Sequence, residues 1–156
     1  MYLWLKLVHV LAMVLFVGNI VTGVFWHKHA LRTGDARLVA HAMDGVLRSD
    51  RLFTMPGVLL LVASGVLAAV AGGLHMLRTG WILWSIVLFA VSGIVFGMRL
   101  TPLQRRMREL AQAGAASGTF DRAAYERLSR QWDFWGAVAT LAPLVAVALM
   151  VLKPAI

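Results

Sequence analysis

Four long runs of apolar residues, separated by stretches that carry most of the charges, organise this 156-residue chain. They extend over residues 2–26, 52–72, 81–98 and 132–152. Each run is close to the roughly 17–25 residues that an α-helix needs to cross the hydrocarbon core of a bilayer. None alternates with the period of two that a membrane β-strand requires. The pattern therefore predicts an all-α, polytopic membrane protein in which residues 1–156 form a single four-transmembrane-helix bundle.

The two longer connections carry helical patterns of their own. Between the first two runs, apolar residues recur on one helix face: Leu38, Val39, Ala42, Met43, Val46 and Leu47. This stripe predicts an amphipathic helical extension of the second span, with a bend where Pro56 cannot donate to the carbonyl of Leu52. In the connection before the last run we expect a break at the small residues 113–118. Thr119 or Asp121 then caps a new helix.

Composition supports a lipid environment. Apolar residues make up 60% of the chain and charged residues 14%, against roughly 45–50% and 25% in soluble domains. A chain of this size could not hide so much apolar surface in water. The absence of cysteine excludes disulfides, thiolate metal sites and iron–sulfur clusters.

Positive charge is distributed unevenly among the connections. Twelve of the 15 Lys and Arg residues lie in the two longer connections, and the hairpin between the second and third runs holds only Arg78. By the positive-inside rule, both longer connections face the cytoplasm and both termini lie outside. We expect a multi-pass protein of a bacterial inner membrane, whose cytoplasmic Arg clusters contact anionic lipids. This placement argues against nucleic acid as the partner of the basic charge.

A few polar side chains fall where a cofactor could bind. Lys6 and His9 are three residues apart in the first run, hence on one helix face, and Met13 follows one turn later. An imidazole can ligate haem iron, handle protons or hydrogen-bond a neighbouring helix. His75, in the outer hairpin, is a candidate second ligand if it approaches His9. We predict no metal site other than this.

Other residues suggest helix packing. Asn19 and Thr22 lie in the inner half of the first run, where an amide needs an interhelical partner. Gly93 and Gly97 form a GxxxG motif that, with nearby serines, predicts a close-packing face towards a neighbouring helix or a second copy. Apart from Asp133 at the inner edge of the fourth run, no carboxylate falls inside the four predicted runs, which argues against a proton- or cation-coupled transporter. Hydrolytic and phosphoryl-transfer motifs are also missing from the sequence.

Several segments resemble known membrane families. The segments 2–10, 16–19, 50–57 and 102–107 resemble a bacterial family of predicted integral membrane proteins that carries only a label of unknown function. More distantly, residues 4–9 and the four-helix layout resemble the haem-binding membrane protoporphyrinogen oxidases and the membrane domain of copper-resistance proteins. That distant resemblance implies haem b as a cofactor, with His9 as an iron ligand.

Two functional classes follow from the sequence. One is a haem- or porphyrin-associated redox protein with a histidine ligand on the first helix. The other is a non-catalytic membrane scaffold or transport accessory protein, in which His9 and Asn19 serve helix packing. Whether the chain is an enzyme stays open, and a homo-oligomer is compatible with either class.

Overall fold

The computed structural model describes residues 1–155, and every regular element among them is helical. Four helices are long and apolar enough to cross a membrane: Tyr2–Thr33, Ala36–Ala71, Gly80–Ser117 and Arg122–Leu152. They contain eight segments, which are α1 (Tyr2–Thr33), α2 (Ala36–Ser49), η1 (Asp50–Thr54), α3 (Met55–Ala71), α4 (Gly80–Val95), η2 (Phe96–Leu100), α5 (Thr101–Ser117) and α6 (Arg122–Leu152). The predicted all-α, four-span fold is confirmed.

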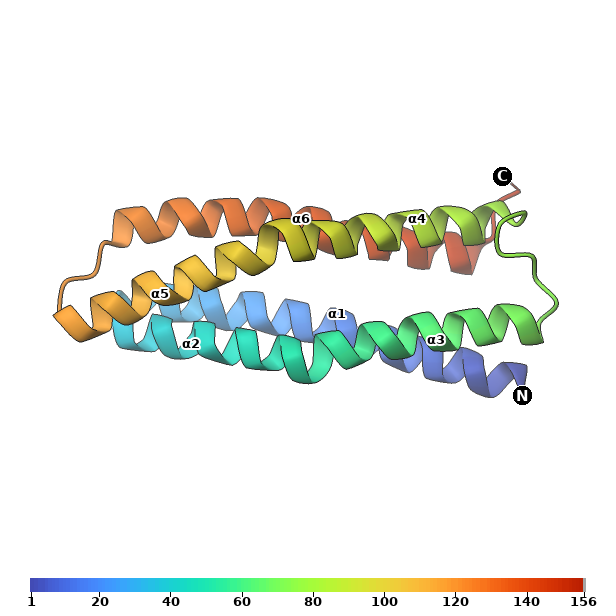
Figure 1. Ribbon diagram of the computed structural model, residues 1–156, viewed down its shortest axis with the longest axis horizontal. Helices are drawn as coiled ribbons and strands as arrows, with labels where there is room; N and C mark the ends of the chain where they lie inside the picture. The colour runs from blue at the N-terminus through green and yellow to red at the C-terminus, as the bar shows by residue number, and fades with distance from the viewer. Residues whose placement is uncertain (156) are drawn as a thin grey trace.

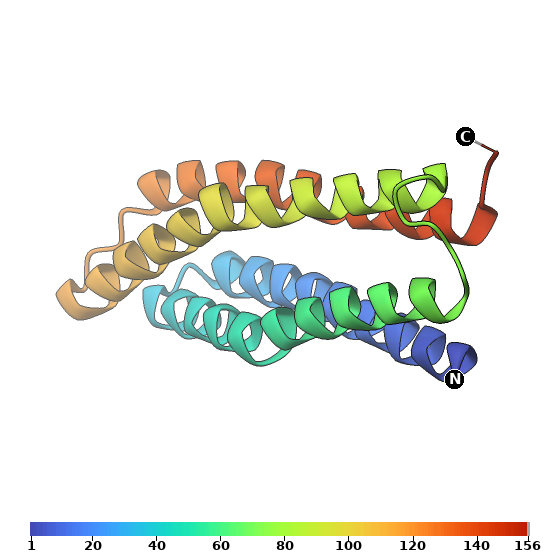
Figure 2. The ribbon, with the colours of Figure 1, turned by 45° about the vertical axis from the view of Figure 1, so that its right-hand side comes forward.

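The helices form two hairpins that lie side by side. α1 packs along α2 and α3, and α6 packs along α4 and α5. Both termini and the α3–α4 connection lie at one end of the molecule, as Figure 1 shows. The short α1–α2 and α5–α6 turns lie at the other end (Figure 2). We call these the terminal end and the turn end.

The predicted amphipathic extension of the second span is α2. The carboxylate of Asp35 caps it by accepting a hydrogen bond from the Arg37 backbone amide at 2.7 Å. Val39 and Met43, from the predicted stripe, are completely buried. α2 therefore continues the membrane helix beyond the apolar run because its apolar face packs against α1 and α5.

The predicted break in the longer connection occurs at the last residue of the expected stretch. α5 runs through the small residues to Ser117 and ends at Gly118, whose φ of +72° is a left-handed conformation that glycine adopts easily. The carboxylate of Asp121 then caps α6, accepting from the Ala124 amide at 2.9 Å. The alanines in this stretch favour a helix, because alanine has the highest helix propensity. Gly114 has no side chain, so Phe120 can pack closely against the helix there. Packing thus keeps the small residues helical.

Each hairpin contains one helix with a widened, π-helical turn, and a proline follows each turn. In η1 the amide of Met55 donates to the carbonyl of Asp50, and in η2 the amide of Thr101 donates to that of Phe96. The next residues, Pro56 and Pro102, have no amide hydrogen and would clash with the carbonyl four residues back. The widened turns relieve this clash, which is the physical basis of the bend expected at Pro56.

The buried core lies towards the turn end. Its largest side chains come from α2, α5 and α6, including Met43, Met107, Tyr125 and Trp132, and α1 contributes the small Ala30. Nearer the terminal end, α4 and α6 are joined by hydroxyl groups: Ser92 Oγ donates to the Ala139 carbonyl at 2.6 Å. Pro143 cannot donate to that carbonyl, so the serine supplies the missing partner. The two hairpins are thus firmly packed internally and meet chiefly in the turn-end half.

Candidate functional site

His9 is packed against α3. Its Nδ1 lies 2.9 Å from the Leu61 carbonyl oxygen and 3.3 Å from Ser64 Oγ. A Cβ added at Gly65 would lie 3.0 Å from the His9 ring, so a larger residue there would require the imidazole to shift. The ring therefore occupies a notch in the neighbouring helix and is oriented by a backbone acceptor.

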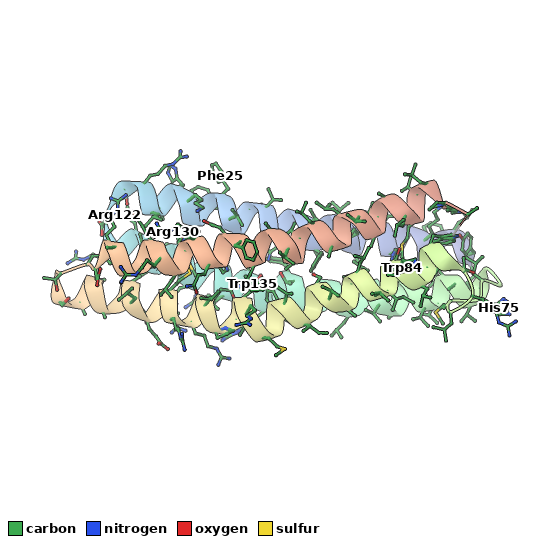
Figure 3. The ribbon with its side chains drawn as sticks, turned by 90° about the horizontal axis from the view of Figure 1, so that it is seen from above. Phe25, His75, Trp84, Arg122, Arg130 and Trp135 are labelled. Atoms are coloured by element: carbon green, nitrogen blue, oxygen red, sulfur yellow. The ribbon has the colours of Figure 1, made fainter. Side chains whose placement is uncertain are left out.

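The other predicted cofactor residues are not gathered around His9. Lys6 is exposed, and Met13, one turn along α1, is half-buried. His75 is exposed in the α3–α4 connection and points away from the helices at the terminal end (Figure 3). The approach of His75 to His9 does not occur in this structure.

The glycines predicted to pack helices lie in open surroundings. A Cβ added at Gly93 or Gly97 would meet no other atom within 4 Å. Within the chain, neither glycine is a point of close helix contact. Close approach between α1 and α3 occurs instead at Gly57, next to Phe16, and at Gly65. Thr22 is exposed.

A cavity of about 700 Å³ separates the two hairpins in the middle of the molecule. All four long helices line it, and most lining residues are apolar or aromatic, among them Phe16, Phe89, Phe96 and Trp132. Gly93 and Gly97 also belong to its wall. Its volume is within the roughly 300–1,000 Å³ typical of small-molecule sites.

One wall of this cavity carries a polar network centred on Asp50. Thr54 Oγ1 and Asn19 Nδ2 both donate to Asp50 Oδ1, at 2.9 and 3.3 Å. Asn19 also donates to Thr54 Oγ1 at 2.8 Å. Gln104 Nε2 donates to Asp50 Oδ2 at 2.9 Å. The network joins α1, η1 and α5, so it links the two hairpins beside the widened turns.

A second polar group closes the turn end of the cavity. Lys28 on α1 forms an ion pair with Asp133 on α6, and Asp133 lines the cavity. His27 is the residue before Lys28, and its buried ring packs edge-on against Trp132. Its Nε2 lies 3.0 Å from the Tyr125 hydroxyl oxygen. These contacts tie α1 to α6 at the level where the cavity ends.

Comparison with known proteins decides the family. The sequence pattern of the predicted integral membrane proteins designated DUF2269 matches residues 3–154. The chain belongs to the DUF2269 family. No curated protein and no solved structure matches it. The predicted resemblance to a membrane family of unknown function is confirmed, and the distant resemblance to haem proteins is not.

Haem does not fit the surroundings of His9 in this DUF2269 protein. His9 is absent from the wall of the central cavity, and the ring lies against Gly65. We therefore derive no chemistry through haem.

The sequence pattern did not mark Asp50 as a candidate site residue. It placed Asp50 just before the second run, yet this side chain is only 8% exposed and lies beside Asn19. Asn19 is seven residues, or about 10 Å of helix, from the aromatic belt at Trp26. The sequence spacing could have indicated that Asp50 is buried, because it lies on the same helix face as Val39, Met43 and Val46. The expectation of no carboxylate in the interior of a predicted run stays a prediction, because Asp50 precedes the second run by two residues.

Proposed function

We propose that this DUF2269 protein is a non-catalytic membrane protein that takes an amphipathic small molecule from the lipid phase into its central cavity. The observation that carries this proposal is an apolar cavity between the hairpins with one buried polar network in its wall. Such a combination, a mainly apolar wall and a few fixed polar groups, is the usual form of a small-molecule site. It develops the transport-accessory alternative derived from the sequence.

Access from the lipid phase is supported by the exposure of cavity residues. Val21 on α1 is 58% exposed and Leu141 on α6 is 60% exposed, although both line the cavity. Apolar side chains that line a cavity and are also exposed on the outer surface lie at the opening of that cavity. Because these helices are apolar enough to span a membrane, the mouth opens towards acyl chains, and an amphipathic molecule can enter sideways.

A binding role is favoured over catalysis by the state of the polar groups. Asn19, Asp50, Thr54 and Gln104 hydrogen-bond one another, and Ser92 donates to a helix carbonyl. Groups held in this way orient a ligand and supply specificity, whereas a nucleophile needs an adjacent base to activate it. No redox group is needed for this role.

The membrane side and the lipid partners belong to the same proposal. We place the turn end in the cytoplasm of a bacterial inner membrane, because the Arg-rich connections lie there. α6 carries a hollow of about 370 Å³ towards that end, and its lining residues are Arg127, Arg130, Gln131, Phe134 and Trp135. The Arg99 guanidinium lies 5.2 Å from the Trp135 ring centre. Figure 3 shows Arg130 and Trp135 on the same helix, α6. These arginines are suited to the phosphates of anionic lipids.

Photolabelling in lipid nanodiscs tests the proposal. A neutral long-chain alcohol that carries a diazirine is expected to label peptides of the cavity wall. Gly93→Phe should reduce this labelling by roughly tenfold, because the new ring enters open space at the wall. Gly18→Phe is the matched control, since Gly18 also has open space but lies outside the cavity wall. Equal labelling of both variants would contradict the proposal.

A further inference from the structure

We infer that the cavity selects an amphipathic cation, whose ammonium group binds Asp50 while its apolar part lies among the aromatic side chains. This inference rests on the proposed function and names the class of molecule that the cavity takes. The juxtaposition that supports it is a buried, hydrogen-bonded carboxylate in the wall of an apolar intramembrane cavity.

The hydrogen bonds identify the Asp50 carboxyl as an acceptor. Its two oxygens receive three donors, from Thr54, Asn19 and Gln104. An ionised carboxylate offers acceptors only, and it is satisfied by this arrangement without any donor of its own. The network therefore holds a negative charge at a fixed place in the wall.

The cavity contains no side chain that neutralises this charge. Three ion pairs occur within residues 1–155, and they join Lys28 to Asp133, Arg108 to Asp44, and Arg122 to Glu126. Asp50 takes part in none of them. Among the described residues that line the cavity there is no Lys, Arg or His, whereas two are Asp. Since Lys28 already pairs with Asp133, Asp50 supplies the uncompensated charge.

A charge in such a place attracts its opposite strongly. Water is scarce in an apolar cavity, so a cation and a carboxylate interact there with less screening than at the surface. Four aromatic residues in the same wall, Phe16, Phe89, Phe96 and Trp132, offer faces that also attract cations. An anionic head group would be repelled, and a neutral hydroxyl would gain a hydrogen bond to the carboxylate but no attraction between two opposite charges.

The apolar surroundings determine the rest of the ligand. Phe16 of α1 and Phe89 of α4 approach each other across the cavity, with ring centres 6.0 Å apart. Beyond them the wall is formed by side chains such as Val58 and Ala139. A molecule of alkyl or aromatic character therefore fits behind the charged head.

The test compares two probes that differ only in charge. A diazirine-bearing alkylamine and the alcohol of equal chain length are titrated into nanodiscs of zwitterionic lipid, and labelling of cavity-wall peptides is measured by mass spectrometry. The amine is expected to half-saturate at a concentration roughly tenfold to hundredfold lower than the alcohol, the range of a charge-assisted hydrogen bond.

Variants assign the preference to Asp50. Asp50→Asn keeps the size of the side chain and removes its charge, so it should abolish the advantage of the amine and weaken labelling by the alcohol much less than labelling by the amine. Asp44→Asn is the matched control, because Asp44 pairs with Arg108 outside the cavity. Gln104→Met removes one donor and keeps the charge, so the amine should retain its advantage if this variant remains folded by gel filtration.

Each outcome separates the two proposals. If both probes label the cavity equally, or if Asp50→Asn keeps the preference for the amine, the inference of a cationic ligand is overturned and the proposed function stands. If neither probe labels the cavity wall in the unmodified protein, the proposed function fails and the inference fails with it.

Discussion

Two polar side chains inside the apolar helices, His9 and Asp50, are held by different kinds of partner. His9 lies against a backbone carbonyl of the adjacent helix in the same hairpin. Asp50 is bound by side chains from its own helix, from α1 and from α5 of the other hairpin. Burial without these bonds would cost several kcal/mol, of order 2–7 for a polar group. The histidine contact therefore joins helices within a hairpin, and the aspartate network joins the hairpins.

Replacing His9 tests its role as a packing residue. His9→Ala empties the notch at Gly65 and removes the contact with the Leu61 carbonyl. We expect the free energy of unfolding to fall by about 1–3 kcal/mol, measured by thermal or denaturant unfolding in detergent. His41→Ala, at an exposed position of α2, should change it by less than about 0.5 kcal/mol.

The same pair of proteins tests the haem alternative. An absorption spectrum of the purified protein, oxidised and then reduced with dithionite, is expected to show no Soret band that depends on His9. A Soret band that is present in the unmodified protein and lost in His9→Ala would contradict the packing role and support the hypothesis of a haem-binding redox protein.

At the scale of elements, the two bent helices place the polar network. η1 and η2 each contain five residues and end just before a proline. A widened turn inserts one extra residue into the helix. The helical segment before the turn is therefore rotated about the helix axis by about 100°, compared with an uninterrupted helix. Because of this rotation, the buried face of α2 that contains Val39 and Met43 leads to Asp50. α3 can at the same time turn Gly57 and Gly65 towards α1.

Removing the proline of the first widened turn tests this explanation. In Pro56→Ala, residue 56 regains an amide that can donate to Leu52, so the turn should close and the bend decrease. The chain has no cysteine, so spin labels at His41→Cys and Val66→Cys are specific. The distance between them should increase in Pro56→Ala. Pro143→Ala, in α6, should leave it unchanged, and an unchanged distance in Pro56→Ala would rule out the proline as the cause.

At the scale of the whole molecule, two hairpins meet chiefly at the turn end. α2 packs on α5 there, and the core residues gather around that contact. Towards the terminal end each hairpin is packed within itself, through α1 with α3 and α4 with α6. The cavity lies where the hairpins part, which is why its wall includes residues from all four long helices.

Cysteine labelling tests how this molecule is oriented in the membrane. With a membrane-impermeant maleimide, Ala115→Cys near the turn end should react only after the inner membrane is disrupted. His75→Cys, in the connection at the terminal end (Figure 1), should react in intact spheroplasts. The reverse pattern would overturn the orientation derived from the positive charges.

Local properties of the sequence were enough to establish the helices and their environment. Hydropathy and run length are read within about twenty residues, so the four spans, α2 and the cap at Asp121 were predictable. The bend at Pro56 was predictable for the same reason, since it depends on one missing amide. The helical conformation of residues 113–117 was not, because local composition does not show that Phe120 packs closely against Gly114.

Only the tertiary structure decided which polar residues form a site. The network joins Asp50 and Thr54, which are neighbours on one helix, to positions 19 and 104, which are distant in sequence. These three segments come together because the two hairpins pack at their turn ends. The predicted residues around His9 were chosen by spacing on one helix, and spacing cannot show which neighbouring helix faces them. Sequence therefore determined that this protein lies in a membrane, and packing determined that a carboxylate faces a cavity within it.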